Sequence, residues 1–317
     1  MKKYSVAKTF SIPVPENIAI MGWDAPTPNT PPVDAGYVFR MEVLRDILAW
    51  LTVGKGEGLF LTGPTGCGKS SCIVQVAARL NIPVYRVTAH SRLEFPELVG
   101  QFVMGRKGMT YCYGPLARAM QDGGIFLLDE IDMLDPATAV GLNGIVEGAP
   151  LTIPENGGEV VYPHDQFRFV ATGNTAGNGD MTGSYSGTLK QNLAFLDRFW
   201  VLQVGYPDES LEQSILERLG VVPEKLIPKF VKAANEIRSM FVAHGDEPWS
   251  ENRINITMST RVLIRWATLT VFYGGLSRNG IQPLYYALDR ALLFRAQPHE
   301  RSAVREVVQR VFGVDPN

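Results

Sequence analysis

The sequence contains few of the residues that cross-link a chain or hold a metal. Its 317 residues include three cysteines and four histidines, and no two cysteines form a C-x-x-C pair. A disulfide framework and a cysteine zinc site are therefore excluded, and a reducing compartment is indicated. The histidines are scattered and share no helical spacing with carboxylates, which argues against a protein-bound transition metal.

An excess of one charge and a long apolar run are also missing. Thirty Lys and Arg residues against 32 Asp and Glu residues leave a formal charge of -2, which disfavours nucleic acid as a partner. The best apolar run near the C-terminus, Val262 to Leu276, contains Arg265 and is too short to span a bilayer. Polar residues and prolines interrupt the first 23 residues, so a secretory signal is not expected. We expect a cytoplasmic protein without membrane contact.

What the sequence does contain is an alternation of short apolar runs with amphipathic stretches. The apolar runs, which we expect to be strands, are Gly58–Thr62, Pro83–Thr88, Ile125–Asp129, Phe167–Thr172 and Phe199–Val204. The stretches with helical spacing around them are Arg40–Leu51, Gly68–Leu80, Pro115–Met120, Pro136–Glu147 and Thr188–Arg198. This alternation predicts an α/β fold with a five-stranded, mostly parallel sheet and helices on both faces.

Two antiparallel hairpins interrupt this alternation. One is predicted at Gln101–Tyr113, with its turn at Gly105–Gly108. The other is predicted at Leu151–Val161, with its turn at Glu155–Gly158. Each has turn-forming residues between two apolar runs, which is typical of a hairpin.

The two ends of the chain differ from its middle. The first 35 residues are rich in proline, which removes amide donors and favours extended geometry. After Pro207 only helical patterns remain. We therefore expect an extended arm at 1–35, an α/β nucleotide-binding domain at 36–206 and an all-helical lid subdomain at 207–317, with a hinge at Gly205–Pro207.

The most specific motif is Gly63-Pro-Thr-Gly-Cys-Gly-Lys-Ser70, which matches G-x-x-x-x-G-K-[ST] in full between an expected strand and an expected helix. The glycines let the backbone approach phosphates closely, with N–H groups and the helix N-terminus directed at them. Lys69 is expected to contact the β- and γ-phosphates, and the Ser70 hydroxyl to join a Mg²⁺ shell. Because Cys67 lies near the positive helix end, we expect a lowered pKa for its thiol.

A pair of carboxylates ends the third expected strand. Asp129 and Glu130 follow the aliphatic run Ile125–Leu128, so they belong at the ligand-binding edge of a parallel sheet. Asp129 is expected to hold Mg²⁺ directly or through water, and Glu130 to act as the general base on the attacking water. The predicted nucleotide-binding set is Gly63, Pro64, Thr65, Gly66, Cys67, Gly68, Lys69, Ser70, Ser71 and Asp129, with Ser70 and Asp129 as the metal pair.

Three further motifs accompany these two: Ala171–Thr175, Leu196–Phe199 and Ser259–Arg261. With them the sequence resembles the AAA+ ATPases. Within that superfamily it is most similar to the MoxR branch, and there to the ATPase subunits of cobaltochelatase. The similar segments are Pro32–Asp34, Tyr37–Phe39, Gln75–Asn81, Leu98–Gly100, Gly114–Ala117 and Thr172–Thr188.

The resemblance implies roles for three side chains. Asn174 corresponds to the sensor asparagine that helps to position the attacking water. Arg198 corresponds to the arginine finger that a neighbouring subunit receives in trans, and Arg261 to the second sensor arginine, which acts in cis from the lid. The residues alone leave two alternatives open, since Arg198 can pair with Asp197 or another surface acid and Arg261 can be solvated. The finger implies a homo-oligomeric ring, usually a hexamer in this family.

The resemblance also implies that the two hairpins are insertions facing the pore of the ring or a partner. The contact residues on the first hairpin are Phe102, Met104, Arg106, Lys107, Met109 and Tyr111. The alternative is that the hairpins cap their own core. The implied partner is a protein client or an accessory subunit, such as one with a von Willebrand A domain.

These features together predict a ring-forming, Mg²⁺-dependent ATPase that uses ATP hydrolysis to remodel a protein partner. A narrower alternative is the ATPase motor of a cobaltochelatase, whose other subunits would hold the metal and the macrocycle. Another is a nucleic-acid motor or a GTP-driven restriction component, which the mild acidity disfavours. A non-hydrolysing nucleotide switch is disfavoured because Asp129, Glu130 and Arg198 are all present.

Overall fold

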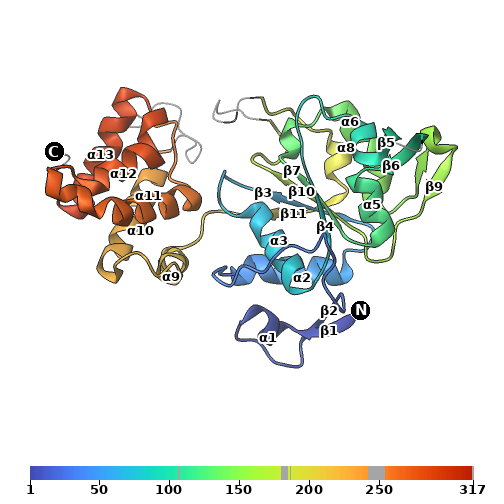
Figure 1. Cartoon of the computed structure of the whole chain (residues 1–317), viewed down its shortest axis with the longest axis horizontal. Coiled ribbons are helices and arrows are strands. Elements are labelled where there is room, and N and C mark those ends of the chain that lie inside the picture. The colour runs from blue at the N-terminus through green and yellow to red at the C-terminus, as the bar shows by residue number, and fades with distance from the viewer. Residues whose placement is uncertain (106–107, 180–184, 186, 242–253, 316–317) are drawn as a thin grey trace.

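The computed structural model describes residues 1–105, 108–179, 185, 187–241 and 254–315 (Figure 1). An α/β domain and a helical subdomain lie next to each other, and the segment between β11 and α9 crosses from one to the other (Figure 1). No helix in these ranges is long and apolar enough to cross a membrane.

The α/β domain is built on a five-stranded sheet. Its strands are β3 (Gly58–Thr62), β4 (Val84–Thr88), β7 (Ile125–Asp129), β10 (Arg168–Gly173) and β11 (Phe199–Gln203). Their order is β11-β3-β10-β7-β4, and all four neighbouring pairs are parallel. Every residue of β3, β7 and β10 is buried, as expected for strands covered on both faces. The predicted α/β fold is confirmed.

Alternate residues of these strands pack into two separate cores. Leu59 and Leu61 face a core that contains α2 (Met41–Val53) and α3 (Lys69–Arg79). Phe60 faces the opposite core. That core is covered by α4 (Phe95–Val99), α5 (Pro115–Asp122), α6 (Pro136–Gly141), α7 (Asn143–Val146) and α8 (Leu193–Leu196). Helices therefore cover both faces of the sheet, as predicted.

One expected helix is much shorter than the sequence pattern indicated. Of the stretch 188–198, only α8 is helical. The residues before it bond to other loops: the Leu189 amide donates to the Asp132 carbonyl at 2.6 Å, and the Gln191 amide to the Gly177 carbonyl at 2.9 Å. Because these tertiary hydrogen bonds replace the helical ladder, the prediction of a helix over 188–192 was wrong.

The prediction of an extended arm at 1–35 was also wrong. Strands β1 (Lys2–Ser5) and β2 (Ala19–Gly22) pair antiparallel, with α1 (Val6–Phe10) between them. Val6, Phe10 and Ile20 are buried in the core around α2 and α3. The prolines fall between α1 and β2 or after β2, where they do not interrupt the pairing, so apolar burial decides the local structure.

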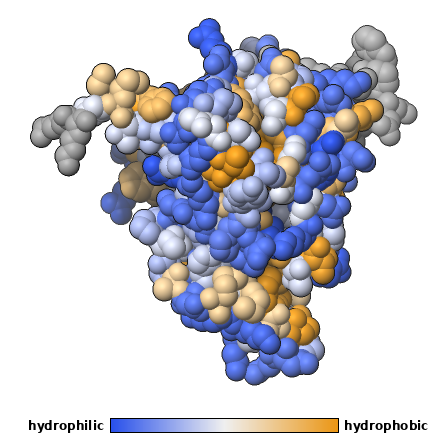
Figure 2. Space-filling view, turned by 90° about the vertical axis from the view of Figure 1, so that its right-hand side faces the viewer, coloured by the Kyte–Doolittle hydropathy of each residue, from blue (hydrophilic) through white to orange (hydrophobic). Residues whose placement is uncertain are grey.

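Both predicted hairpins are present. They consist of β5 (Gly100–Gly105) with β6 (Gly108–Tyr113), and β8 (Leu151–Ile153) with β9 (Glu159–Val161). Met104 and Met109 of the first hairpin are 76% and 65% exposed. Arg106 and Lys107 lie outside the described residues. This side of the molecule is mostly hydrophilic, with separate hydrophobic spots (Figure 2).

The remaining helices form a subdomain with its own core. They are α9 (Glu209–Arg218), α10 (Ile227–Ser239), α11 (Thr260–Phe272), α12 (Pro283–Ala291) and α13 (Pro298–Phe312). Phe230, Trp266 and Phe312 pack edge to face at its centre, with ring centroids 4.7–5.7 Å apart. Such aromatic burial gives the subdomain a core independent of the sheet.

Candidate functional site

The loop between β3 and α3 has a backbone that favours glycine at three places. Gly63, Gly66 and Gly68 have φ angles of 148°, 70° and 97°. A Cβ on Gly63 would lie 2.0 Å from the Val204 carbonyl oxygen. The loop therefore wraps tightly at the carboxyl end of the central strand, and its amides and the first turn of α3 form an anion-binding concavity.

Lys69 is held in this loop by three acceptors. Its Nζ donates to the Gly63 carbonyl at 2.7 Å, to the Pro64 carbonyl at 3.0 Å and to Asn174 Oδ1 at 3.0 Å. The side chain is buried, and burial lowers the pKa of Lys69 despite nearby carboxylates that raise it. Its ammonium is therefore oriented toward the loop and lacks a direct carboxylate partner among the described residues.

Asp129, at the end of β7, collects three donors. Oδ1 accepts from Ser70 Oγ at 2.5 Å and from Thr172 Oγ1 at 2.9 Å. Oδ2 forms an ion pair with Arg86 Nε. A hydroxyl and a carboxylate at one point are the hard oxygen donors that Mg²⁺ takes, so Ser70 and Asp129 fit that ion. Sequence analysis did not foresee Arg86, since an isolated arginine in a strand carries no local signal.

Glu130 follows directly, and the chain turns sharply at it. Its φ of 58° lies in the left-handed region, which is uncommon for a residue other than glycine. Its amide donates to Thr172 Oγ1 at 3.3 Å, and its exposed side chain lines the pocket described below. The structure thus places Glu130 beside Asp129, open to solvent.

Asn174 follows β10 and is fixed by a buried carboxylate. Asp132 accepts from the Asn174 amide at 2.5 Å, from the Thr175 amide at 3.0 Å and from Thr175 Oγ1 at 2.8 Å. Burial raises the pKa of Asp132, although these donors act to lower it. Asp132 therefore orients the loop that presents Asn174 to Lys69. Sequence analysis missed this residue, because its partners are more than 40 positions away.

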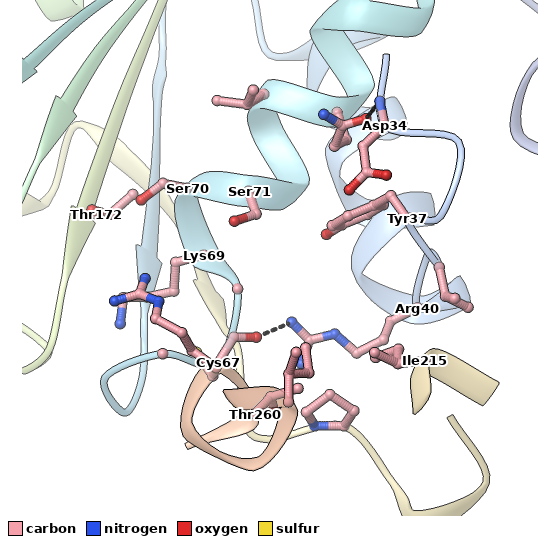
Figure 3. Close-up of a pocket in the computed structure, with 18 of the residues that line it drawn as sticks. Asp34, Tyr37, Arg40, Cys67, Lys69, Ser70, Ser71, Thr172, Ile215 and Thr260 are labelled. Carbon is pink, nitrogen blue, oxygen red and sulfur yellow. Dashed lines mark hydrogen bonds between the residues drawn. The ribbon is translucent and has the colours of Figure 1, made fainter. Parts of the chain in front are cut away.

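A cavity of about 620 Å³ between the α/β domain and the helical subdomain is lined by Lys69, Ser70, Asp129, Glu130 and Asn174. In Figure 3, Lys69, Ser70 and Ser71 project from α3, Tyr37 and Arg40 stand opposite, and Thr260 and Ile215 come from the helical subdomain. The cavity also contacts Asp34, Val38, Arg86, Leu211, Arg218, Arg261 and Ile264. Stretches of chain that are far apart in the sequence thus meet at one site.

The segment 34–40 forms a wall of the cavity that sequence reasoning did not assign. Arg40 Nη2 donates to the Cys67 carbonyl at 3.0 Å (Figure 3), and its Nη1 donates to the Gly205 carbonyl at 2.7 Å. The Asp34 amide donates to Gln75 Oε1 at 2.9 Å. Arg40 therefore joins this wall to the phosphate loop and to the expected hinge. The only sequence signal in this region was the family resemblance of Pro32–Asp34 and Tyr37–Phe39.

The helical subdomain closes over the loop from the other side. Ser259, the N-cap of α11, lies so close that its Cβ would be 2.6 Å from a Cβ on Gly66. Arg261 follows in the first turn of α11 and lines the cavity. Tyr206, in the segment that joins the two parts, donates from its hydroxyl to the Thr65 carbonyl at 3.1 Å. Arg261 is therefore brought to the cavity in its own chain.

Arg198 lies elsewhere. Its carbonyl accepts from the Gly58 amide at 3.0 Å, and Phe199 pairs with Gly58 at the first position of β3. The phosphate loop follows the last position of that strand, so Arg198 lies at the opposite end of the parallel strands. There Arg198 Nε forms an ion pair with Glu147 Oε1 at 3.1 Å, and its Nη1 donates to the Ala194 carbonyl.

Cys67 differs from expectation. Its thiol is 3% exposed and donates to the Val204 carbonyl at 3.0 Å. Burial raises the pKa of Cys67, more than Lys69 and Arg40 lower it. The expected low-pKa thiol is therefore wrong, because the side chain points into the apolar core under the loop rather than toward the helix end.

Comparison with known proteins agrees with this geometry. Residues 58–199 match the family model "AAA domain (dynein-related subfamily)", and residues 212–311 match "CbbQ/NirQ/NorQ C-terminal". The aerobic cobaltochelatase subunit CobS of Sinorhizobium sp is 30% identical over 90% of this chain and 83% of its own length. Protein CbbQ of Hydrogenophilus thermoluteolus is 30% identical over 80% of this chain and 87% of its own length.

A solved structure from Cytophaga hutchinsonii is similar at 16% identity, with a TM-score of 0.45 over 84% of this chain and 79% of that one. The phosphate loop and the family matches define the class as an AAA+ protein, and an AAA domain implies nucleotide binding. The chain belongs to the MoxR-type AAA+ ATPases, the group that includes CobS, NirQ and CbbQ.

Proposed function

We propose that this protein is a Mg²⁺-dependent ATPase that hydrolyses ATP in the cavity between its two parts. The observation that carries the proposal is the convergence of Lys69, Ser70, Asp129 and Asn174 on that one cavity. The loop amides and Lys69 bind the β- and γ-phosphates, and Gly63 and Gly68 keep the backbone close to them. When bound between Ser70 and Asp129, Mg²⁺ neutralises charge on the phosphates.

Glu130 acts on the attacking water. Its carboxylate is exposed to the cavity next to Asp129, so it can accept a proton from a water molecule that faces the γ-phosphate. Asn174 orients that water while its Oδ1 holds the Lys69 ammonium. Asp132, behind it, keeps the amide in place. The product phosphate and ADP remain under Arg261 until the helical subdomain moves about Gly205–Pro207.

Arg198 serves the site of a neighbouring subunit, and the working form is a ring, which we take to be a hexamer. The five residues of β3 separate Arg198 from its own phosphate loop, which is about 16 Å of strand. An arginine side chain cannot cover that distance to its own nucleotide. A copy of the chain placed against the cavity can receive it, and its planar guanidinium suits the charge on the transferred phosphoryl group.

The work of the ring is the remodelling of a protein partner in the cytoplasm. The exposed apolar side chains on the β5–β6 hairpin, including Phe102, Met104 and Met109, support a protein contact there. An accessory subunit with a von Willebrand A domain is one form of such a partner. The similarity to a cobaltochelatase subunit over 90% of this chain favours a second candidate, the ATPase motor of a cobalt-inserting complex.

A mixing experiment tests hydrolysis and the ring together. Arg198→Ala and Lys69→Ala chains are each expected to release little phosphate from ATP. Mixed in equal amounts, they form rings in which about a quarter of the sites combine an intact Lys69 with a neighbour's intact Arg198. Mixed rings should therefore regain activity, whereas a mixture as inactive as its parts would contradict the finger in trans.

The client can be identified with the Glu130→Gln chain. This variant is expected to keep ATP bound and to hold the partner in the engaged state. Proteins retained with ATP are compared with those retained by Lys69→Ala, which should hold neither nucleotide nor client. Retention of a chelatase large subunit would favour the cobalt-inserting motor. Retention of a different metalloenzyme would exclude that candidate function.

A further inference from the structure

Arg86 makes a contact with Asp129 that neither the sequence motifs nor the family resemblance assigns. Of the donors around this carboxylate, Ser70 and Thr172 are neutral hydroxyls, and both bond to Oδ1. Arg86 alone reaches Oδ2, and it is the single ion-pair partner of Asp129 in the described part of the chain. The two oxygen atoms of Asp129 therefore have different partners, and one of them is cationic.

The sheet explains how Arg86 reaches this carboxylate. Strand β4 lies beside β7 in parallel register, with Arg86 opposite Leu127 and Thr88 opposite Asp129. Arg86 therefore starts two residues below Asp129, and its long side chain extends along the strand to the edge where the cavity opens. The Arg86 side chain is 55% exposed while Asp129 is 4% exposed, so the arginine can move away at little cost and the carboxylate cannot.

A buried carboxylate needs a counter-charge. Lys69 is close by, but its Nζ bonds to Gly63, Pro64 and Asn174. Arg86 thus provides the only direct positive partner that the described residues offer to Asp129. A divalent cation coordinated at Ser70 and Asp129 would occupy the same carboxylate, and two cations in contact at one site repel each other.

We propose that Arg86 is a positioning residue that neutralises Asp129 in the metal-free site and competes with Mg²⁺ for that carboxylate. The proposal rests on the nucleotide site proposed above. It assigns to Arg86 two effects: it keeps Asp129 in place before nucleotide arrives, and it weakens the gain in nucleotide affinity that Mg²⁺ provides. Removing the guanidinium therefore makes nucleotide binding more dependent on Mg²⁺.

The test is a comparison of ADP affinity with and without the metal. A fluorescent ADP analogue is titrated into the full chain in excess Mg²⁺ and in EDTA. The Kd in EDTA is then divided by the Kd in Mg²⁺, which gives the gain in affinity that the metal provides. In Arg86→Gln this ratio should rise about three- to fivefold over wild type, since half-exposed ion pairs contribute on the order of 1 kcal/mol. Arg86→Met, which keeps the aliphatic stem, should show the same rise.

Arg118→Gln is the matched control, because Arg118 is exposed on α5 and does not line the cavity. Its ratio should equal that of wild type, and thermal unfolding should show that all variants are folded. An unchanged or smaller ratio in both Arg86 variants, or an equal rise in Arg118→Gln, overturns the proposal. Failure of the nucleotide site itself would appear differently, as a wild-type chain that does not bind ADP in either condition.

Discussion

Lys69 Nζ and Asn174 Oδ1 are 3.0 Å apart, and this hydrogen bond joins the phosphate loop to the end of β10. The two residues are 105 positions apart in the chain, and only the placing of β10 next to β3 brings them together. The cation expected to bind phosphate is thus already oriented by the side chain expected to position water.

Replacing Lys69 tests the phosphate-binding role of the loop. Lys69→Met keeps the length of the side chain but removes the ammonium, so we expect the Kd for ATP to rise by about tenfold or more. The control is Lys55→Met, at an exposed lysine that pairs with Asp165 on the surface. The measurement is a titration with a fluorescent ATP analogue, and equal affinities for the two variants would count against the site.

The pH dependence of nucleotide binding should also report Lys69. Burial lowers its pKa, so in the alkaline range below 10.5, its ordinary value, the unfolded chain holds more protons than the folded one. The contribution of Lys69 to the free energy of unfolding therefore rises with pH across this range. Phosphate favours the ammonium, so nucleotide affinity falls over the same range.

This effect is measured as the Kd for fluorescent ADP at a series of alkaline pH values. Lys69→Met has no titrating group at this position. Its Kd for ADP should therefore rise less steeply with alkaline pH than the Kd of wild type. The same slope in both proteins would mean that another group titrates.

Asp132 should be needed for the geometry of the loop at Asn174. Asp132→Ala leaves the Asn174 amide, the Thr175 amide and the Thr175 hydroxyl without their acceptor, and we expect a loss of about 2–3 kcal/mol in the free energy of unfolding. Asp132→Asn can still accept from the two amides with its oxygen, so its loss should be smaller. Denaturant unfolding of both variants measures the difference, and equal losses would contradict it.

Breaking the buried ion pair of the helical subdomain should strongly destabilise it. Arg238 and Glu212 bond through both guanidinium Nη atoms at 2.7 and 2.8 Å, and Thr260, beside the cavity, donates to the same carboxylate. Arg238→Met leaves Glu212 as an unpaired buried charge, which costs about 3–5 kcal/mol. The double variant Arg238→Met with Glu212→Leu should recover part of that loss.

The control for this pair is Arg310→Met, which breaks an exposed ion pair with Glu236 and should change stability little. Thermal unfolding of the three variants measures these changes in stability. If Arg238→Met and Arg310→Met behave alike, the buried pair does not stabilise the subdomain as described.

The strands and the phosphate loop could be predicted because their signals are local. A buried parallel strand is a short apolar run, and β3, β7 and β11 begin where the sequence indicated. The loop is a motif of eight consecutive residues whose glycines have a defined backbone role.

Other parts could not be predicted because their cause is tertiary. Asp132 and Arg86 are single charged residues whose partners come from distant parts of the chain. The segment 188–192 has helical spacing, but its amides bond to distant loops instead. At the N-terminus the prediction relied on how many prolines there are and not on where they lie, which is outside the paired strands. The burial of Val6 and Phe10 was not visible from the pattern alone.

The central claim is that ATP is hydrolysed at this site with Glu130 as the base, and the Glu130→Gln chain tests it most directly. The measurement is phosphate release from Mg·ATP alongside the Kd for ATP, in wild type and in the variant. The account predicts that the variant binds ATP about as tightly as wild type and releases phosphate at least about 100-fold more slowly. Phosphate release at the wild-type rate, with ATP bound equally well, would contradict it.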